Sequence, residues 1–571
     1  MGEIMTRWRT RTRDEGSALI VVLGTTMVLI ILATVAATAA MNTNRVARHS
    51  SDWNQALAAA EAGVDDYLAR LNKNDLYWQT ATDCANPAMK RPNVSSCSWG
   101  AGTPVGWVKV PGADRAEYHY EAETGSTPVN GTIKLTATGR VGDVTRSVQT
   151  VLRRGGFGEF LYYTVYEEVD PANDSTYNGS PRSTTWAANN CVRYWWPTNT
   201  PRHADCVNIQ FAGGDVINGP MHTNDRILTG GAVRFKGTTT TSWPDCAKTG
   251  TAKKCYTKAS STANPIFEKG ISYRPEIELP TTIGDLRQYV NGTNPLVPKT
   301  GCLYTGPTRI KLLASSATHS TMQVWSPYSR TALNPGCGNA ANFASSPNTS
   351  QTMTIPHNSL IIVQDIPASA PFTVKQNTNG SCQTGTISVY PQADDWNETL
   401  SDARCRYGTL YVEGTLKGRL TLVADNNIII TDHLTYNGGK TGTDSLGLIA
   451  GNSVKIYHPV KKSGSNFSDM DRPESKGKFK DAVVHASILT LMHSFNVQAW
   501  DKGSTSGLGK LNLFGSFAQR YRGPVALTSG TGYDKNYEYD TRLRYAPPPY
   551  FLDPVRSSWG IKAYGEISAA H

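Results

Sequence analysis

The sequence predicts an α+β protein with a long N-terminal helix, a small antiparallel β-sheet and a large, mainly-β domain. An uncharged apolar stretch near the N-terminus continues into residues with helical periodicity, and a segment of alternating apolar and polar residues follows. The remaining residues combine short strand patterns with an apolar repeat of six. With 39% hydrophobic and 18% charged residues, the 571-residue chain is not expected to be disordered or a coiled coil.

The first predicted element is an apolar helix over residues 18–41. No charged residue stands between Gly16 and Asn44. At about 1.5 Å per residue, this stretch extends roughly 36 Å, which is enough to cross a bilayer. The predicted membrane helix includes Ala18, Leu23, Val28, Leu32 and Met41.

The charges that flank this helix predict its orientation. Only Arg45 and Arg48 follow it closely, whereas four arginines precede it: Arg7, Arg9, Arg11 and Arg13. This excess predicts a single-pass membrane protein with a cytoplasmic N-terminus and extracellular C-terminal domains.

A cleaved secretory signal is the competing interpretation, because residues 37–39 fit the small-residue cleavage pattern. The apolar stretch is longer than the usual core of such a signal. The helical pattern also continues beyond it, through Leu57, Ala60, Val64, Leu68 and Leu71. We therefore favour a helix that is retained in the mature protein.

Two sequences around the apolar stretch carry a family resemblance. Residues 14–23 read Asp-Glu-Gly-Ser-Ala-Leu-Ile-Val-Val-Leu, and residues 55–63 read Gln-Ala-Leu-Ala-Ala-Ala-Glu-Ala-Gly. Together they resemble the N-terminus of PilX-type minor pilins of type IV pili. In that family a basic leader ends in Gly, prepilin peptidase cuts on the cytoplasmic side, and the new N-terminal residue is methylated. By position, the resemblance implies a cut between Gly16 and Ser17.

The resemblance and the residue patterns together divide the chain, and the resemblance implies a set of partners. We expect a leader (1–16), a pilin-like transmembrane and amphipathic helix (17–75), an antiparallel head (76–154) and a large β domain (155–571). The implied partners are other pilin subunits, the pilus assembly machinery, prepilin peptidase and membrane lipid, with a host or surface ligand if the protein serves adhesion.

One position departs from the pilin pattern. Major pilins carry Glu at the fifth mature position, where this chain has Val21. In the family that carboxylate is thought to neutralise the terminal ammonium of a neighbouring subunit, because an unpaired charge in the membrane is costly. The resemblance therefore implies an initiating, tip-placed or sparsely incorporated subunit. The alternative is a lone single-pass anchor that never polymerises.

The segment after the helix predicts the head. Apolar and polar residues alternate over residues 116–123 and 132–141, and residues 141–144 carry a two-residue hairpin signal before a return strand to Leu152. These strands predict a small antiparallel sheet.

The large domain carries the repeat of six. Apolar residues recur at Leu410, Leu416, Leu422, Ile428 and Leu434. This spacing favours stacked rungs of a β-solenoid, with an ordinary β-sandwich as the alternative. The segment from Gly515 onward resembles the C-terminal part of large bacterial pilus-assembly proteins, and we expect it to cap the open end of the solenoid.

Ten cysteines all lie beyond the membrane helix, which fits five disulfides in an exported region. Ten cysteines allow many connectivities. Their grouping suggests sequential pairs: Cys84 with Cys97, Cys191 with Cys206, Cys246 with Cys255, Cys302 with Cys337, and Cys382 with Cys405. A zinc site is the rival, but the sequence has no C-x-x-C pair.

The search for reactive groups yields no catalytic residue, metal site or cofactor, so we expect no enzyme. His485 and His493 lack a carboxylate partner in the sequence pattern and read as structural. Asp469, Asp471 and Glu474 could hold calcium, but five lysines surround them, so a solvated loop is favoured. Residues 194–196, Tyr-Trp-Trp, could present a platform to sugars, but packing in a disulfide-closed loop is favoured.

The sequence is consistent with three functions. The favoured one is a membrane-anchored minor pilin or pseudopilin-like subunit that displays its β domain for assembly, tip capping or adhesion at the pilus tip or cell surface. The second is a surface-anchored β-helix enzyme that acts on polysaccharides. The third is a DNA-binding uptake subunit, supported by a net charge of +10. Because that charge is spread out, nucleic acid is not expected as a partner.

Overall fold

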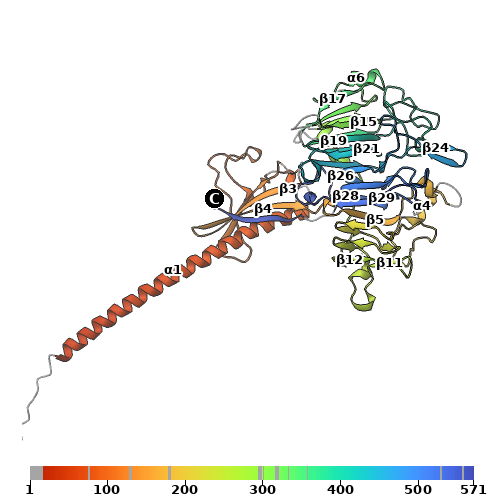
Figure 1. The fold of residues 1–571 in the computed structure, drawn as a ribbon. Coiled ribbons are helices and arrows are strands. Elements are labelled where there is room, and N and C mark those ends of the chain that lie inside the picture. The colour runs from red at the N-terminus through yellow and green to blue at the C-terminus, as the bar shows by residue number, and fades with distance from the viewer. Residues whose placement is uncertain are drawn as a thin grey trace, which may run out of the picture. The chain divides into compact units, whose positions relative to one another are not determined.

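The computed structural model divides the chain into two compact units. The residues it describes are 17–74, 77–80, 82–125, 127, 131–177, 182–292, 299, 301–314, 320–331, 333–356, 358–527, 530–555 and 559–571. The first unit, here the head unit, comprises Met1–Thr124, Ile133–Leu152 and Ile561–His571. The second, here the large β domain, comprises Gly125–Thr132 and Arg153–Gly560. A long helix and a mainly-β domain, as predicted, define an α+β protein (Figure 1).

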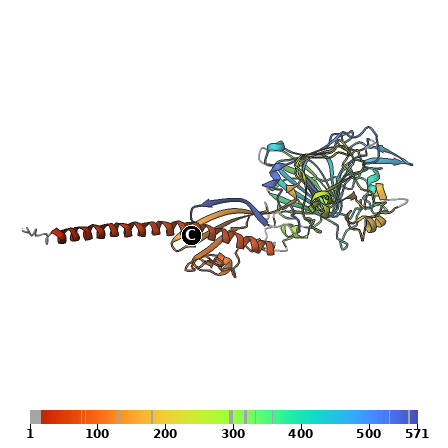
Figure 2. The ribbon, with the colours of Figure 1, turned by 90° about the horizontal axis from the view of Figure 1, so that it is seen from below.

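Helix α1 spans Ser17–Lys73 and has two kinds of surface. Its first half is exposed throughout, whereas residues from Ala56 onward bury one face against the head sheet. Figure 2 shows this second half lying along the strands of the head. Arg70 and Lys73 in the last turn suit the negative end of the helix dipole.

The head sheet contains five strands in the order β1 (Val108–Lys109), β2 (Ala116–Glu123), β3 (Thr132–Val141), β4 (Val144–Arg154) and β30 (Trp559–Ile567). β1 pairs antiparallel with β2, and β2 pairs antiparallel with β3, as the alternation in the sequence indicates. Gly142, between β3 and β4, has a φ of +59°, a conformation that glycine adopts without strain.

Strand β30 corrects an expectation about the C-terminus. The sequence analysis placed residues 515–571 in a cap on the large domain, but β30 lies beside β4 in the head sheet. Thr150 Oγ1 donates to the Ala563 carbonyl at 2.8 Å, and Arg146 pairs with Glu566 at 2.5 Å. The returning strand covers an edge of β4 that would otherwise expose unpaired backbone groups.

The large β domain is built from parallel ladders of short strands. The longest ladder runs, in spatial order, through β14 (Cys302–Thr305), β18 (Ser359–Gln364), β20 (Arg419–Ala424), β22 (Ser445–Ala450), β26 (Val483–Thr490), β28 (Lys510–Arg522), β5 (Tyr162–Val169), β7 (Met221–Thr223), β10 (Thr239–Thr241) and β13 (Ile271–Tyr273).

Two further ladders accompany it. One runs through β15 (Thr308–Leu313), β19 (Leu410–Leu416), β21 (Ile428–Tyr436), β23 (Val454–Ile456) and β27 (Phe495–Val497). The other begins at the first half of β28 and continues through β29 (Asp534–Tyr539), β6 (Val216–Asn218), β9 (Arg234–Phe235) and β12 (Ile266–Phe267).

Smaller elements decorate the ladders. β16 (Thr321–Trp325) and β17 (Gln351–Thr354) extend β15 by antiparallel pairing, β8 (Ile227–Thr229) pairs with β11 (Tyr256–Lys258), and β24 (Val460–Ser463) forms a hairpin with β25 (Asn466–Asp469). The short α-helices among the described residues include α3 (Asp174–Tyr177), α4 (Thr184–Cys191), α5 (Gln288–Asn291) and α6 (Ala340–Ser345).

The repeat of six reflects the length of a rung. Leu410 pairs with Ile428 and Val412 with Ile430, so two stacked strands are eighteen residues apart, which is three repeats. The predicted series Leu410, Leu416, Leu422, Ile428 and Leu434 is fully buried. Leu410 and Leu416 lie at the two ends of β19, Leu422 lies in β20, and Ile428 and Leu434 both lie in β21.

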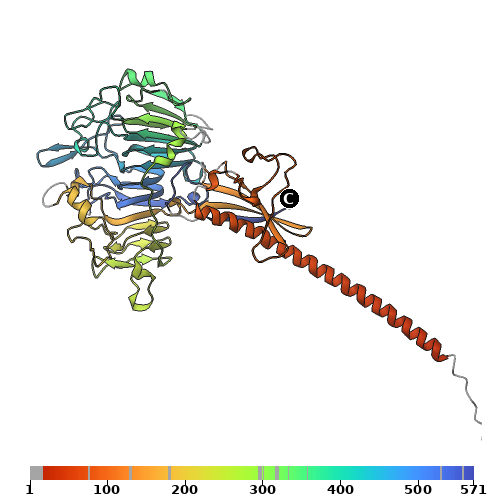
Figure 3. The same cartoon turned by 180° about the vertical axis from the view of Figure 1, so that it is seen from behind.

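The first strand of the large β domain, β5, lies inside the parallel stack and not at one of its ends. β5 pairs with β7 on one side and with β28 on the other, so residues near the start and the end of the domain are neighbours (Figure 3). The prediction that the segment from Gly515 caps the stack is therefore also wrong for β28 and β29. Both are internal strands and do not lie at an end of the stack. Phe517 of β28 lies opposite Tyr162 of β5, which protects an edge that β5 would otherwise leave open.

Five disulfides join Cys84 to Cys97, Cys191 to Cys206, Cys246 to Cys255, Cys302 to Cys337, and Cys382 to Cys405. These are the pairs named from the grouping of cysteines along the sequence. One lies in the head unit and four in the large β domain.

Candidate membrane anchor and surface sites

The first half of α1 presents apolar side chains outward on all sides. Leu23, Val28 and Leu32 are each more than half exposed, and Val21 and Met41 are exposed as well. Ala18 is also exposed. This stretch is long and apolar enough to cross a membrane. Gly16 lies outside the described residues, and Ser17 is the first residue of α1.

The few hydroxyls in this stretch are satisfied within the helix. Thr25 Oγ1 donates to the Val21 carbonyl at 2.8 Å, Thr26 Oγ1 donates to the Val22 carbonyl at 2.8 Å, and Thr38 Oγ1 donates to the Thr34 carbonyl at 2.8 Å. Because lipid offers no hydrogen-bond partners, internal pairing of this kind is what a membrane-spanning helix requires.

The second half of α1 packs closely on the head sheet through small residues. Ala56, Ala59 and Ala60 are buried. A Cβ added at Gly139 of β3 would lie 2.1 Å from the Ala56 carbonyl oxygen, so only glycine fits there. The small-residue segment at 55–63 is therefore explained by the close approach of helix and sheet.

A polar network fixes the end of α1. Arg70 pairs with Asp66 at 2.8 Å, Tyr120 on β2 donates to Asp66 at 2.6 Å, and Asn86 donates to the Tyr120 hydroxyl at 2.6 Å. Burial and the neighbouring Asp66 raise the pKa of Tyr120, so this hydroxyl remains a donor. The network joins helix, strand and loop within the head unit.

The two histidines singled out from the sequence have separate surroundings. His485 Nδ1 accepts a hydrogen bond from the Tyr436 amide at 3.2 Å, and burial lowers the pKa of His485. His493 lies 3.0 Å from Asp170, so the expectation that it lacks a carboxylate partner is wrong. Asp170 lies about three hundred residues away in the sequence and was not visible from the local pattern. Burial lowers the pKa of His493, but Asp170 outweighs that effect and the net change is a rise.

The three acidic residues considered for calcium are each paired with a different base. Asp469 lies 3.1 Å from His458, Asp471 lies 2.8 Å from Lys478, and Glu474 lies 2.7 Å from Arg309. Arg309 and Lys311 lower the pKa of Glu474 to about 2. Within the described residues these carboxylates stabilise a loop and do not share a cation site.

The aromatic segment at 194–196 is divided between packing and exposure. Tyr194 stacks on Trp196, with ring centroids 4.7 Å apart, and contacts Tyr166 on its other side. Trp195 remains 40% exposed, with the Arg226 guanidinium 3.4 Å from its ring centroid. Packing therefore accounts for two of the three rings, and the third is available at the surface.

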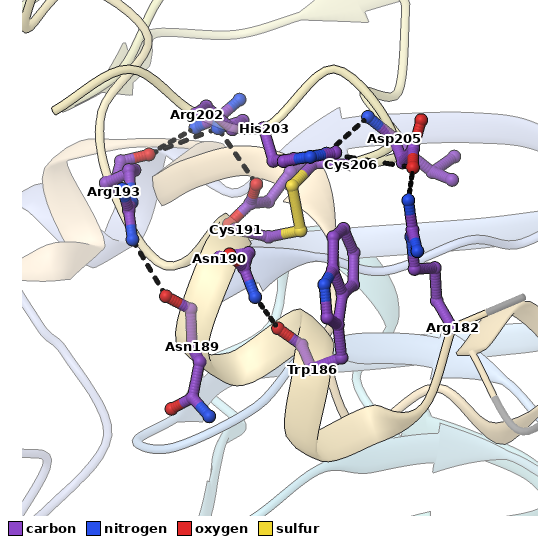
Figure 4. Close-up of a disulfide and its surroundings, with 12 residues drawn as sticks. Arg182, Trp186, Asn189, Asn190, Cys191, Arg193, Arg202, His203, Asp205 and Cys206 are labelled. Atoms are coloured by element: carbon purple, nitrogen blue, oxygen red, sulfur yellow. Dashed lines mark hydrogen bonds and ion pairs between the residues drawn. A yellow bond between two sulfur atoms is a disulfide. The ribbon is translucent and has the colours of Figure 1, made fainter.

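Figure 4 shows how a disulfide fixes the base of this segment. The Cys191–Cys206 bond joins the end of α4 to the loop that carries Arg202. Arg202 donates to the Arg193 carbonyl at 3.1 Å and pairs with the buried Glu168 at 2.9 Å. Arg202 also pairs with the buried Asp225, so the loop is held in a defined position by one covalent bond and two buried ion pairs.

A polar groove borders the 3-10 helix η8 (Trp396–Thr399) of the large β domain. It has a volume of about 440 Å³ and is lined in part by Asp395, Trp396 and Glu398. Burial raises the pKa of Asp395 to about 6, and burial together with Asp395 raises the pKa of Glu398 to about 8. The Tyr411 hydroxyl donates to Glu398 at 3.2 Å. Sequence reasoning missed this groove, because nothing in the local pattern marks these two acids.

Comparisons with known proteins do not establish a family for this chain. No protein-family model matches the chain, and no curated protein matches it. The crystal structure of the competence-associated pilin ComZ from Thermus thermophilus is similar at 12% sequence identity and a TM-score of 0.27, over 90% of this chain and 97% of that chain. Similarity at this level does not establish a family or an activity.

Proposed function

We propose that this chain is a pilin-like, membrane-anchored subunit that displays a large β domain outside the cell. The observation that carries the proposal is the two-part surface of α1. One continuous helix offers an exposed apolar half of membrane-spanning length and a second half that packs on an antiparallel sheet. A lone anchor needs only the first part, whereas a subunit that emerges from the membrane into a folded head needs both.

The finer points of the proposal follow from the sequence. The N-terminus is cytoplasmic, prepilin peptidase cleaves between Gly16 and Ser17, and the mature subunit resembles PilX-type minor pilins. Val21 leaves no carboxylate for a neighbouring subunit, which favours a tip or initiating position. Five disulfides in the region after the helix support an exported location.

We further propose that the parallel ladders of the large β domain wind as a β-solenoid. Ladders with an eighteen-residue spacing support this winding, and a β-sandwich of antiparallel strands would not produce them. The solenoid presents Trp195 and the polar groove as candidate surfaces for adhesion or assembly contacts.

Co-expression with a prepilin peptidase tests the class of subunit. The full-length chain should shorten by its leader only when the peptidase is present, and Gly16→Val should block the shortening. Gly2→Val, which changes a glycine at the far end of the leader, should leave it intact. Peptidase-independent shortening, or equal processing of Gly16→Val, would overturn the assignment.

The enzyme alternative has one specific observation in its favour, namely carboxyl groups with raised pKa values in a groove. We propose that the protein is not an enzyme, because Glu398 is held by Tyr411 and its raised pKa follows from burial beside Asp395. Cleavage of acidic polysaccharides by the full-length protein, lost in Glu398→Gln and retained in Glu268→Gln, would establish the alternative instead.

The DNA alternative predicts free basic side chains on the surface. Lys461 pairs with Asp394, Lys478 with Asp471, and Lys535 with Asp215. Bases that are neutralised in this way contribute little to phosphate binding. We propose that DNA is not a ligand, and salt-sensitive retention on immobilised duplex DNA would contradict this.

A further inference from the structure

A buried histidine in the head sheet has one ring nitrogen without a hydrogen-bond partner. His119 on β2 is fully buried, and its Nδ1 lies 2.9 Å from the Gly106 carbonyl oxygen. A carbonyl can only accept, so Nδ1 carries the proton and Nε2 carries a lone pair. Among the described residues, none forms a hydrogen bond with this Nε2. An unsatisfied buried nitrogen is costly and calls for a partner.

Two further ligand-type atoms lie next to this lone pair. Glu121 Oε1 is 3.8 Å from His119 Nε2 and 3.2 Å from His571 Nε2. One ligand atom from each of the three residues fits within a mutual distance of 4.8 Å. A tetrahedral zinc ion with bonds of about 2.0 to 2.1 Å holds its ligands roughly 3.3 Å apart. Small side-chain adjustments would therefore bring all three onto one ion.

The surroundings orient these ligands. The hydrogen bond to the Gly106 carbonyl fixes the His119 ring, and Glu121 Oε2 pairs with Arg91, which leaves Oε1 directed at the histidines. Metal-binding histidines in proteins commonly donate their other ring nitrogen to a backbone carbonyl or a carboxylate. The ring of His571 meets that of His119 edge to face, with centroids 4.7 Å apart.

We propose that His119, Glu121 and His571 bind a Zn²⁺ ion that ties the C-terminal segment to strand β2 of the head. Two imidazole nitrogens and one carboxylate favour zinc over calcium or magnesium, which prefer oxygen ligands alone. The site departs from the expectation of no metal. It joins residues that lie 450 positions apart in the sequence and are brought together by the return of β30.

The ion would complete the attachment of the C-terminal segment. Along β30 itself the sheet is held by Arg146 with Glu566 and by Thr150 with Ala563. The Tyr564 hydroxyl also donates to Glu61, and the Ala570 amide donates to Ser147 Oγ, each at 2.8 Å. The ion would add a further attachment beside Glu121.

Cobalt spectroscopy tests the site directly. Untagged full-length protein in detergent, stripped with a chelator, should bind Co²⁺ with the visible absorption bands of a tetrahedral ion, and Zn²⁺ should displace it. His571→Ala and Glu121→Gln should each weaken binding at least tenfold. The matched control is His203→Ala, because His203 also lies 3.8 Å from a carboxylate, that of Asp205, but has no third ligand nearby in the described structure.

A second measurement separates the metal from a simple ion pair. Hydrogen exchange at residues 561–571 should slow on addition of Zn²⁺ in the wild type and in His203→Ala, but not in His571→Ala. His571 is at the surface, so this variant is expected to fold. The proposal is overturned if the wild type binds neither cation at tens of micromolar, or if His571→Ala binds both as tightly as the wild type.

Discussion

The head unit and the large β domain are built on opposite plans. The head sheet pairs antiparallel strands that are close in sequence, and its core forms against helix α1. The large β domain stacks parallel strands whose core lies between its own ladders. The core of the head therefore includes part of a helix whose other half is apolar and exposed. The core of the large β domain is formed by its own strands. Changes in α1 should affect the anchor and the head and leave the large domain folded.

The largest expected effect is on the membrane anchor. Val28→Arg combined with Leu32→Arg places two charges in the apolar half of α1, at a cost of about 5 to 7 kcal/mol for insertion. The variant should move from the membrane fraction to the soluble fraction, or be lost.

The matched control is Ser50→Arg with Asn54→Arg, which has the same spacing but lies beyond the apolar stretch. Cell fractionation with blotting measures both. If the first variant stayed in the membrane fraction as completely as the control, the apolar half of α1 would not be the membrane anchor.

The disulfide Cys302–Cys337 should be the next most important feature, because both sulfurs lie in the core of the large domain and close 35 residues. Removal of both cysteines as alanine should lower the stability of this domain by about 3 to 4 kcal/mol. Removal of Cys84 and Cys97 should leave the same thermal transition unchanged. Equal shifts in the two variants would show that the units do not unfold separately.

Gly139→Ala should act on the head alone. The added methyl group would collide with the backbone of α1 at Ala56 and Ala60, at a cost of about 1 to 3 kcal/mol. Gly102→Ala meets nothing within 4 Å and serves as the control. Hydrogen exchange should quicken in β2 and β3 for Gly139→Ala, with no change in the large domain. A head that tolerates both substitutions equally would contradict the close packing.

The smallest expected effect is a pH dependence in the large domain. The pKa of Glu398 is raised by burial and by Asp395 to about 8, so the folded state favours the protonated form. The stability from this group is fully present below about pH 4.5 and is lost as the pH rises to about 8. Glu398→Gln removes this pH-dependent loss of stability, because glutamine does not ionise. Its melting temperature should exceed that of the wild type by a few degrees at pH 8 and match it at pH 4.5.

The control for this prediction is Glu268→Gln. Glu268 pairs with Arg234 at the surface, where an ion pair contributes at most about 1 kcal/mol, so the substitution should not raise the melting temperature at pH 8. A Glu398→Gln shift that is the same at both pH values would mean that folding does not raise the pKa of Glu398.

The features that sequence could predict are those set by nearby residues. The apolar stretch, the hairpin at Gly142 and the buried series from Leu410 follow from local patterns, because each depends on the apolar or turn-forming residues at its own positions. The pairing of β28 with β5 joins residues more than 350 positions apart, and β30 returns to the head. No periodicity encodes which distant edge a strand will cover, and so the predicted cap was wrong.

The same limit applies to the candidate sites. His119 and Glu121 are two positions apart on one strand, a spacing that places both on one face and is visible in the sequence. The third residue, His571, reaches them only through β30. The raised pKa of Glu398 likewise depends on a groove whose walls come from separate segments.

The central claim is that α1 is one helix with two roles, kept whole in the mature protein. Intact-mass analysis of the protein extracted from native membranes tests it most directly. We expect a mature chain that starts at Ser17 and retains residues 18–41. A mature chain that starts near Ala40 would contradict the account, because the apolar half of the helix would then have been a disposable signal.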